Sequence, residues 1–373
     1  RYWQPKFDPD DSRTLEEWED EISAAMKESV QAHKIADVEV GSFLSSGVDS
    51  SYMAALAHVD KTFTVGFANK QYDETDYAQE FSKHIGVKNY AYRITPEEYW
   101  ANLGKIQYHM DEPLADAASV ALYFVNREAS KQVKVCLSGE GADEIFGGYP
   151  WFYRPELMNR DGFPWSADPA ARTSILSDDV LRTLDLAEYS HARYEETLSH
   201  VPHLDGESPE EARRRDIGYL NIKWFMQTLL DRMDRTSMYS SLEARVPFAD
   251  HRIMEYVFNV PWQMKYRNGV EKSLLRDACA DLLPRELLWR KKSPYPKTYH
   301  PAYEQMLIRR MREILNDPNS PVLPLLDRSK TEAFLAAPKE LGKPWFGQLM
   351  AGPQLIAYFI QINTWMQIYH LSI

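Results

Sequence analysis

Two stretches decide the fold of this chain: Phe43-Leu44-Ser45-Ser46-Gly47-Val48-Asp49-Ser50-Ser51 and Leu137-Ser138-Gly139-Glu140-Gly141-Ala142-Asp143-Glu144-Ile145-Phe146-Gly147-Gly148-Tyr149. Each follows a short apolar run that is typical of a buried strand, and each leads into a helical pattern. The first stretch brings hydroxyl groups to a helix start, where backbone N–H groups and the helix dipole attract phosphate. The second places two carboxylates, Glu140 and Asp143, among glycines that let a ligand approach the backbone. Together they predict phosphate, metal and acid–base chemistry in one crevice.

The surrounding sequence predicts an α/β fold, a doubly wound parallel sheet with helices on both faces. Apolar runs indicate strands at residues 38–44, 62–67, 89–94 and 133–137, and helical patterns lie between them. In the common strand order 3-2-1-4-5, the direction of winding reverses between strands 1 and 4, and ligands bind beyond their carboxyl ends. The two stretches follow these two strands. We therefore expect them to face each other across the switch point.

The rest of the chain predicts helices before the sheet and a mostly helical C-terminal half after it. Thr14 and Glu17 form a capping box that starts an amphipathic helix. Residues 151–205 are irregular and polar, and helical periodicity dominates from Ser208, with Pro209 at a first helical position.

Composition excludes several classes of protein. The 373 residues carry a net charge of −12, which argues against a nucleic-acid surface because phosphate contacts need clustered Lys and Arg. Two cysteines, Cys136 and Cys279, provide neither a disulfide framework nor a zinc motif, and we interpret both as packing residues. We find no signal peptide and no apolar stretch of membrane-spanning length. We expect a cytoplasmic protein that binds neither nucleic acid nor membrane; a homodimer remains an open alternative.

Several motifs carry a resemblance to known enzymes. The segment Ser45-Ser46-Gly47-Val48-Asp49-Ser50 resembles the pyrophosphatase loop of ATP-dependent adenylating enzymes, with Ser46 where that loop usually has glycine. The second stretch resembles the synthetase domain of glutamine-dependent asparagine synthetases. Further segments fit the same family in the same order: Asp111-Glu112-Pro113 with Asp116, Leu242-Glu243-Ala244-Arg245-Val246-Pro247-Phe248, Glu271-Lys272-Ser273-Leu274-Leu275-Arg276, and Leu283-Pro284 before Trp289-Arg290-Lys291-Lys292. The resemblance therefore covers residues 1 to about 300, and it implies the adenine nucleotide alpha hydrolase-like fold.

That resemblance implies roles for individual residues. Asp49 and Asp143 would bind Mg²⁺ that carries pyrophosphate, which agrees with the preference of Mg²⁺ for carboxylate and phosphate oxygens. Lys272 would meet the polyphosphate. Glu140 would lie near the acyl-adenylate, as a general base or as a group that stabilises ammonium. The nucleotide would contact the following residues, with Val65 acting through its backbone near Gly66: Leu44, Ser45, Ser46, Gly47, Asp49, Ser50, Val65, Gly66, Ser138 and Gly139. Arg245 and residues 290–292 are alternatives for phosphate contacts or structural ion pairs.

The implied reaction is the amidation of aspartate. ATP would convert the β-carboxylate into β-aspartyl-AMP with release of pyrophosphate, and ammonia would then give asparagine and AMP. One synthetase domain, 1–373, would comprise a linker and lead helix at 1–36, an ATP-binding core at 37–150 and a mostly helical substrate-side part at 151–373. The glutaminase domain of the family, which begins with a nucleophilic cysteine, is absent from the sequence, so we expect ammonia to come free or from a glutaminase domain or subunit.

Three alternatives stay open at this point. The same scaffold in β-lactam and macrolactam synthetases activates a carboxylate for an internal amine. A tRNA-modifying member of the pyrophosphatase-loop group would need a basic surface. A relative without catalytic activity would not need the carboxylates and the lysine that this sequence contains.

Overall fold

The computed structural model describes residues 3–10, 12–45, 47–67, 73–113, 118–166, 169–290, 301–337, 344–345, 348–349 and 352–373. The chain forms two compact units, and each unit is assembled from three separate segments of sequence. Unit 1 comprises Arg1–Thr95, Ala121–Asn159 and His200–Ser293; unit 2 comprises Pro96–Val120, Arg160–Ser199 and Pro294–Ile373. The division of the chain at residues 36 and 150 into functional parts stays a prediction.

Unit 1 is built on a five-stranded parallel sheet with the order β3-β2-β1-β4-β5. Its strands are β1 (Val40–Phe43), β2 (Lys61–Phe67), β3 (Lys88–Ile94), β4 (Val135–Leu137) and β5 (Glu243–Arg245). The predicted α/β class and strand order are confirmed. Strand β1 pairs with β2 on one side and β4 on the other, so the chain reverses its winding between β1 and β4. The sequence did not predict β5, which extends the sheet beyond β4.

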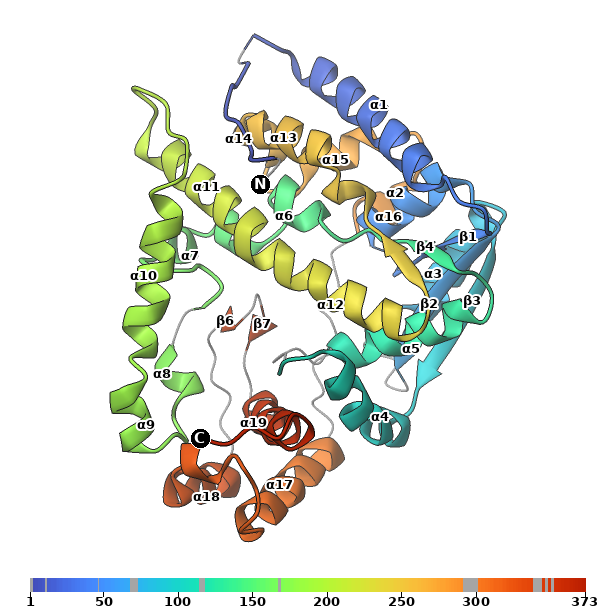
Figure 1. Cartoon of the computed structure of the whole chain (residues 1–373). Coiled ribbons are helices and arrows are strands. Elements are labelled where there is room, and N and C mark those ends of the chain that lie inside the picture. Colours follow the sequence, from blue (N-terminus) through green and yellow to red (C-terminus); the bar gives the residue numbers. More distant parts are fainter. Residues whose placement is uncertain are drawn as a thin grey trace. The chain divides into compact units, whose positions relative to one another are not determined.

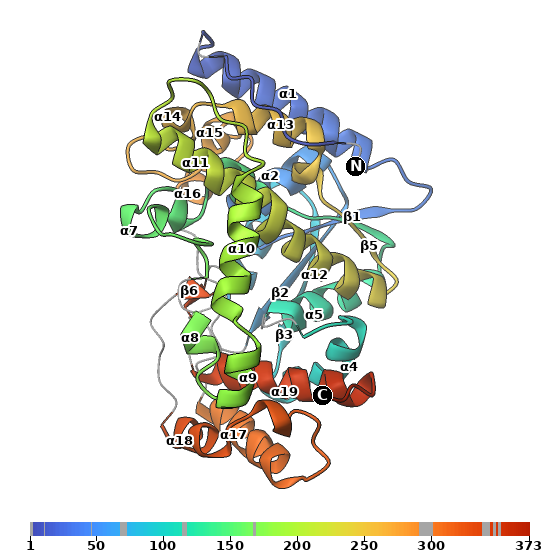
Figure 2. The same cartoon turned by 60° about the vertical axis from the view of Figure 1, so that its left-hand side comes forward.

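Helices cover both faces of this sheet. One core cluster joins α1, α2 and α3 to the helices that follow β5, through buried side chains such as Trp18, Tyr52 and Phe81. Figures 1 and 2 both show α1, α13 and α15 side by side. The other cluster joins Phe43 and Phe63 of the sheet to α5 and α12. The helices of unit 1 are α1 (Leu15–His33), α2 (Val48–Ala57), α3 (Thr75–His84), α5 (Ala118–Ser130, shared with unit 2), α6 (Ala142–Phe146), α7 (Pro155–Met158), α11 (Pro209–Leu220), α12 (Met226–Tyr239), α13 (His251–Asn259), α14 (Trp262–Lys265), α15 (Ser273–Ala278) and α16 (Arg285–Leu288).

The predicted helix starts are confirmed, and one of these helices has an irregular turn. Thr14 and Glu17 form the capping box of α1, and Ser208 caps α11 with Pro209 at its first position. Helix α11 continues into α12 through a π-helical turn at Asn221–Phe225. A π turn inside an α-helix shifts the face that the following residues present, and such turns occur frequently at functional sites.

Unit 2 is mostly helical. Its elements are α4 (Pro96–His109), α8 (Pro169–Arg172), α9 (Asp178–Thr183), α10 (Leu186–Leu198), α17 (Pro301–Asn316), α18 (Arg328–Ala336), α19 (Gly352–Ile368) and a short antiparallel pair, β6 (Pro344–Trp345) and β7 (Gln348–Leu349). Helix α19 packs on α17 and α4, and both views show α17, α18 and α19 grouped together. The indole of Trp365 donates a hydrogen bond of 2.7 Å to the carbonyl of Asp111, which fixes the end of α4 to α19.

The prediction that residues 151–205 are irregular is wrong for α10. Asp185 caps this helix by accepting a hydrogen bond from the Glu188 amide, and the helix has 13 residues. Only Tyr194 of α10 is buried, so the sequence carries no apolar stripe that would have revealed a helix.

Among the residues that the structure describes, no helix combines the length and the apolar character that crossing a membrane requires.

Candidate active site

The first loop is shaped by hydrogen bonds of its own hydroxyl groups. The Ser45 amide donates to the Ser50 hydroxyl at 3.0 Å, and the two hydroxyls lie 3.0 Å apart. Gly47 is the N-cap of α2 and has no side chain to cap the first amides of the helix. The loop therefore presents hydroxyls beside the N-terminal N–H groups of a helix, an arrangement that attracts an anion. Ser46 lies outside the described residues.

Three predicted residues meet behind this loop. The Lys272 ammonium lies 2.8 Å from each carboxylate oxygen of Asp49 and 2.7 Å from Oδ1 of Asp143. Lys272 and Asp143 are buried and Asp49 is mostly buried, with side-chain exposed fractions of 3%, 9% and 16%. Asp49 follows β1, Asp143 follows β4, and Lys272 is the N-cap of α15. Residues 223 positions apart in sequence thus form one charged cluster at the switch point.

Two glycines allow this close approach. A Cβ on Gly139 would lie 2.8 Å from the amide nitrogen of Ser50, because the backbone after β4 packs directly on the first turn of α2. A Cβ on Gly148 would lie 2.0 Å from Oδ1 of Asp143 and 3.1 Å from Cδ of Lys272. The sequence resemblance placed Gly139 at the nucleotide. That contact stays a prediction. The structure shows that Gly139 joins the two loops and that Gly148 makes room for the cluster.

Glu140 lies on the second loop and pairs with an arginine that the sequence did not indicate. Nη2 of Arg232, on α12, donates to Oε1 of Glu140 at 2.9 Å. Both side chains are mostly buried. A guanidinium at this distance stabilises the ionised form of a carboxylate. No motif contains Arg232, which is one of many charged residues on a helix, so only the structure reveals the pair.

The remaining predicted nucleotide residues lie at the carboxyl ends of the central strands. The Leu44 amide and carbonyl bond to the Phe63 carbonyl (2.9 Å) and the Thr64 hydroxyl (2.7 Å), so the sheet holds Leu44 in place. Ser138 donates its amide to the Arg245 carbonyl at 2.8 Å. Val65 and Gly66 are consecutive residues of β2, paired in register with β3. Contact of these residues with a nucleotide stays a prediction.

Other charged residues of the motifs have structural partners. Nη1 of Arg245 donates to the carbonyls of His33 and Ile35, both at 2.8 Å, and so caps the end of α1. Arg276 bonds to the carbonyl of Glu271 at 2.9 Å, to its carboxylate at 3.0 Å, and to the carbonyl of Leu288. Arg276 therefore fixes the backbone of the motif around Lys272. Arg245 has structural partners, and a contact of Arg245 with phosphate is untested.

The cysteines are packing residues, as the sequence indicates. Both Cys136 and Cys279 are free and buried. Burial raises the pKa of the Cys279 thiol to about 12 and raises that of Cys136 further. Thiols with such pKa values stay protonated and are poor nucleophiles.

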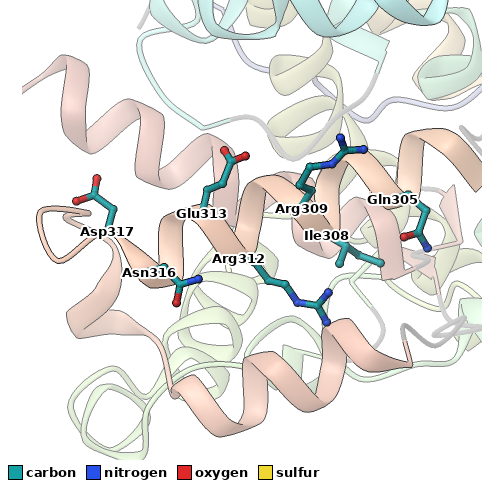
Figure 3. A pocket seen from close by; sticks show the side chains of 7 residues that line it. All are labelled: Gln305, Ile308, Arg309, Arg312, Glu313, Asn316 and Asp317. Atoms are coloured by element: carbon teal, nitrogen blue, oxygen red, sulfur yellow. The ribbon is translucent and has the colours of Figure 1, made fainter.

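Two features of unit 2 lie outside this cluster. Asp161, His191 and Glu195 bring one ligand atom each within 4.8 Å of one another, and all three residues are exposed. A surface hollow of about 540 Å³ lies along α17. Figure 3 shows that its charged residues do not converge, since Arg309 and Glu313 point to one side of the helix and Arg312 to the other. Neither feature contains a predicted site residue.

Comparison with known proteins assigns the chain to a family. The family model described as "Asparagine synthase" matches residues 21–367. The chain belongs to the asparagine synthase family. It is 40% identical over its whole length to asparagine synthetase [glutamine-hydrolyzing] 3 of Bacillus subtilis, of which it covers 64%. It is 33% identical to asparagine synthetase [glutamine-hydrolyzing] 1 of the same organism, over 84% of this chain and 53% of that protein. The human asparagine synthetase [glutamine-hydrolyzing] is 27% identical over 72% of this chain and 41% of its own length.

The chain thus spans less than two thirds of the length of each of these relatives. The family assignment confirms the resemblance that the motifs carry. It applies to the part of the relatives that this chain matches.

Proposed function

We propose that this chain is an ATP-dependent carbon–nitrogen ligase that converts aspartate and ammonia into asparagine through β-aspartyl-AMP, with release of pyrophosphate and AMP. Family membership supports the reaction class. The observation that carries the proposal is the cluster of Lys272, Asp49 and Asp143 at the carboxyl ends of β1 and β4, where ligands of doubly wound sheets bind.

The two aspartates fit a Mg²⁺ site. Their oxygens that face the Lys272 ammonium are no more than about 5.5 Å apart, given their separations of 2.8 and 2.7 Å from it. Mg²⁺ is commonly held by one or two carboxylates together with substrate phosphates. Asp49 and Asp143 would hold the ion, and when bound it would neutralise charge on the departing pyrophosphate.

The chain's own groups account for the binding of the phosphates. The hydroxyls of Ser45 and Ser50 and the first amides of α2 receive the negatively charged groups, and Lys272 stabilises the charge that develops as pyrophosphate leaves. Adenylation turns a poor leaving group into AMP, and it divides one difficult step into two.

Glu140 acts as an ionised carboxylate in this proposal. Its ion pair with Arg232 favours the charged form, which suits stabilisation of the ammonium that forms when ammonia attacks. The interaction with Arg232 therefore supports the electrostatic role.

The nitrogen donor is free ammonia or ammonia delivered by a glutaminase domain or subunit, in a cytoplasmic setting. The names of the relatives state that those proteins hydrolyse glutamine. The homodimer stays an open alternative for the assembly.

ATP–pyrophosphate exchange tests the proposal. The chain is expected to catalyse exchange with aspartate alone, and to form AMP and asparagine in equal amounts when ammonium is added. A panel with glutamate and with larger carboxylic acids that contain an internal amine tests selectivity. Exchange only with the larger acids would assign a lactam synthetase activity instead, and no exchange with any acid would contradict an adenylating enzyme.

A further inference from the structure

Lys272 is held in an unusual way for a residue that would meet a substrate. Its backbone lies in the left-handed region, with φ of 55°, which is a strained conformation for a non-glycine residue. Its ammonium contacts three oxygens of two carboxylates at 2.7–2.8 Å. These oxygens belong to the two residues that would ligate Mg²⁺.

We propose that Lys272 is an internal counter-ion that excludes free divalent metal from the two aspartates until a nucleotide arrives. This inference rests on the proposed function, and it concerns the order of binding. The polyphosphate of the nucleotide draws the ammonium away from the carboxylates, and the metal enters together with the nucleotide. Lys272 thus pairs with the two carboxylates before the nucleotide binds and with the phosphates afterwards.

Electrostatic repulsion prevents the Lys272 ammonium and a divalent metal ion from binding the same carboxylate oxygens at the same time. Two buried carboxylates need a cation nearby, because an uncompensated buried charge is strongly destabilising. Mg²⁺ binds its oxygen ligands at about 2.0–2.1 Å. An ion bound to the oxygens of Asp49 and Asp143 that contact Lys272 would therefore lie within a few ångströms of the ammonium. Like charges at that separation repel. Entry of the metal therefore requires departure of the ammonium.

The surrounding residues restrict how the lysine can leave. Gly148 lies against Asp143 and the Cδ of Lys272, so the carboxylate and the lysine stem are packed together. Arg276 ties α15 to Glu271 and to the Leu288 carbonyl, which fixes the backbone on both sides of the cluster. The flexible end of the four-carbon stem is the part that can move, and an ammonium with three rotatable donors can change partners without a new backbone conformation.

Binding of Mn²⁺, measured by electron paramagnetic resonance, tests this order. Without nucleotide, the wild-type chain is expected to bind Mn²⁺ at least tenfold more weakly than Lys272→Met, in which the carboxylates have lost their counter-ion. Lys272→Gln gives the same comparison with a polar side chain, should Lys272→Met not fold. Lys265→Met is the matched control: it removes another buried lysine, on α14, and is expected to bind Mn²⁺ as the wild type does. Adding Asp49→Asn to Lys272→Met should abolish the increase in Mn²⁺ affinity.

The second part of the experiment measures Mn²⁺ binding in the presence of a non-cleavable ATP analogue, which has a methylene group between its α and β phosphates. With this analogue present, wild type is expected to acquire bound Mn²⁺, and the difference between wild type and Lys272→Gln should shrink. Equal Mn²⁺ binding by wild type and both Lys272 variants without nucleotide would overturn the inference. ATP–pyrophosphate exchange by the wild type is read separately, so its presence would leave the proposed function intact in that case.

Discussion

The backbone at Gly139 packs directly on the backbone at Ser50, where an added Cβ would lie 2.8 Å from the Ser50 nitrogen and 3.0 Å from the carbonyl carbon of Asp49. The second loop therefore positions the first through main-chain contact. Neither of these neighbouring atoms belongs to a flexible side chain, so a substitution cannot be accommodated by a change of rotamer.

Gly139→Ala is expected to separate the two loops. Overpacking of this kind destabilises by about 1–3 kcal/mol. Displacing reacting groups by roughly 1 Å costs about 100-fold in rate, so ATP–pyrophosphate exchange should fall by about that factor. Denaturant unfolding and exchange kinetics measure the two effects. Gly104→Ala on α4, where an added Cβ meets no atom within 4 Å, is the control and should leave exchange unchanged. Unchanged exchange by Gly139→Ala would contradict the positional role.

Glu140→Gln is expected to separate the two half-reactions. The variant keeps the shape of the side chain but removes the charge that would stabilise ammonium, so asparagine formation from ammonia should fall by about 100-fold or more. Pyrophosphate exchange with aspartate needs no ammonia and should remain. Measuring both rates on one preparation checks this, and equal loss of both would place Glu140 in the adenylation step.

Arg232 is expected to act through Glu140. Arg232→Met leaves a buried carboxylate without this guanidinium, whereas Arg232→Met combined with Glu140→Gln removes both charges. The double variant should lose less unfolding free energy than the two single variants lose together, and the difference, the coupling energy, should be about 1–3 kcal/mol. A double-mutant cycle by denaturant unfolding measures this, with Arg232→Lys as the conservative variant. Additive effects would show that the pair is not coupled.

Lys265 is expected to make stability depend on pH. Burial lowers the pKa of this lysine to about 7, from its ordinary value of 10.5. Between these values the unfolded chain binds more protons than the folded chain, so the lysine's unfavourable contribution is largest below about pH 7 and fades as the pH rises toward 10.5. Lys265→Met should therefore raise Tm relative to wild type more at pH 6 than at pH 9. Thermal melts at both pH values check this, and an equal shift at both would indicate that Lys265 of the folded chain is charged at both.

Arg245→Met is expected to weaken the fold and spare the chemistry. Its guanidinium donates two hydrogen bonds to carbonyls at the end of α1, and charge-assisted bonds of this kind contribute about 1.5–3 kcal/mol each. For the two bonds together, the free energy of unfolding should fall by about 3–6 kcal/mol, while the KM for ATP stays constant. A large rise in KM would instead make Arg245 a phosphate ligand.

Much of the sheet could be predicted because β1 and β4 are mostly buried apolar runs, and because β2 and β3 are rich in β-branched and aromatic residues. Residues 62–67 and 89–94 match β2 and β3 to within one residue at each end. Strand β5 could not be predicted, because Glu243 and Arg245 flank a single alanine and its three residues carry no apolar run. Its pairing with β4 depends on contacts between residues about 100 positions apart, which local sequence does not encode.

The site divides in a similar way. Asp49, Asp143 and Lys272 stand in motifs, and their proximity followed from strand order for the first two. The direct contact of Lys272 with both aspartates could not be predicted, since it depends on a left-handed residue at the start of α15. Arg232 lacks a motif altogether. Sequence therefore indicated which groups are present, and the structure shows which of them touch.

The number of residues in the π-helical turn at Asn221–Phe225 determines the direction in which Arg232 points from α12. Each residue of an α-helix advances the side-chain direction by about 100°. Deleting one residue from this turn would let α11 and α12 form a continuous α-helix and would swing Arg232 away from Glu140, although every side chain of the pair would still be encoded. An alignment that scores only identities would count such a deletion as a minor gap. For this helix, spacing deserves the weight that is usually given to residue type.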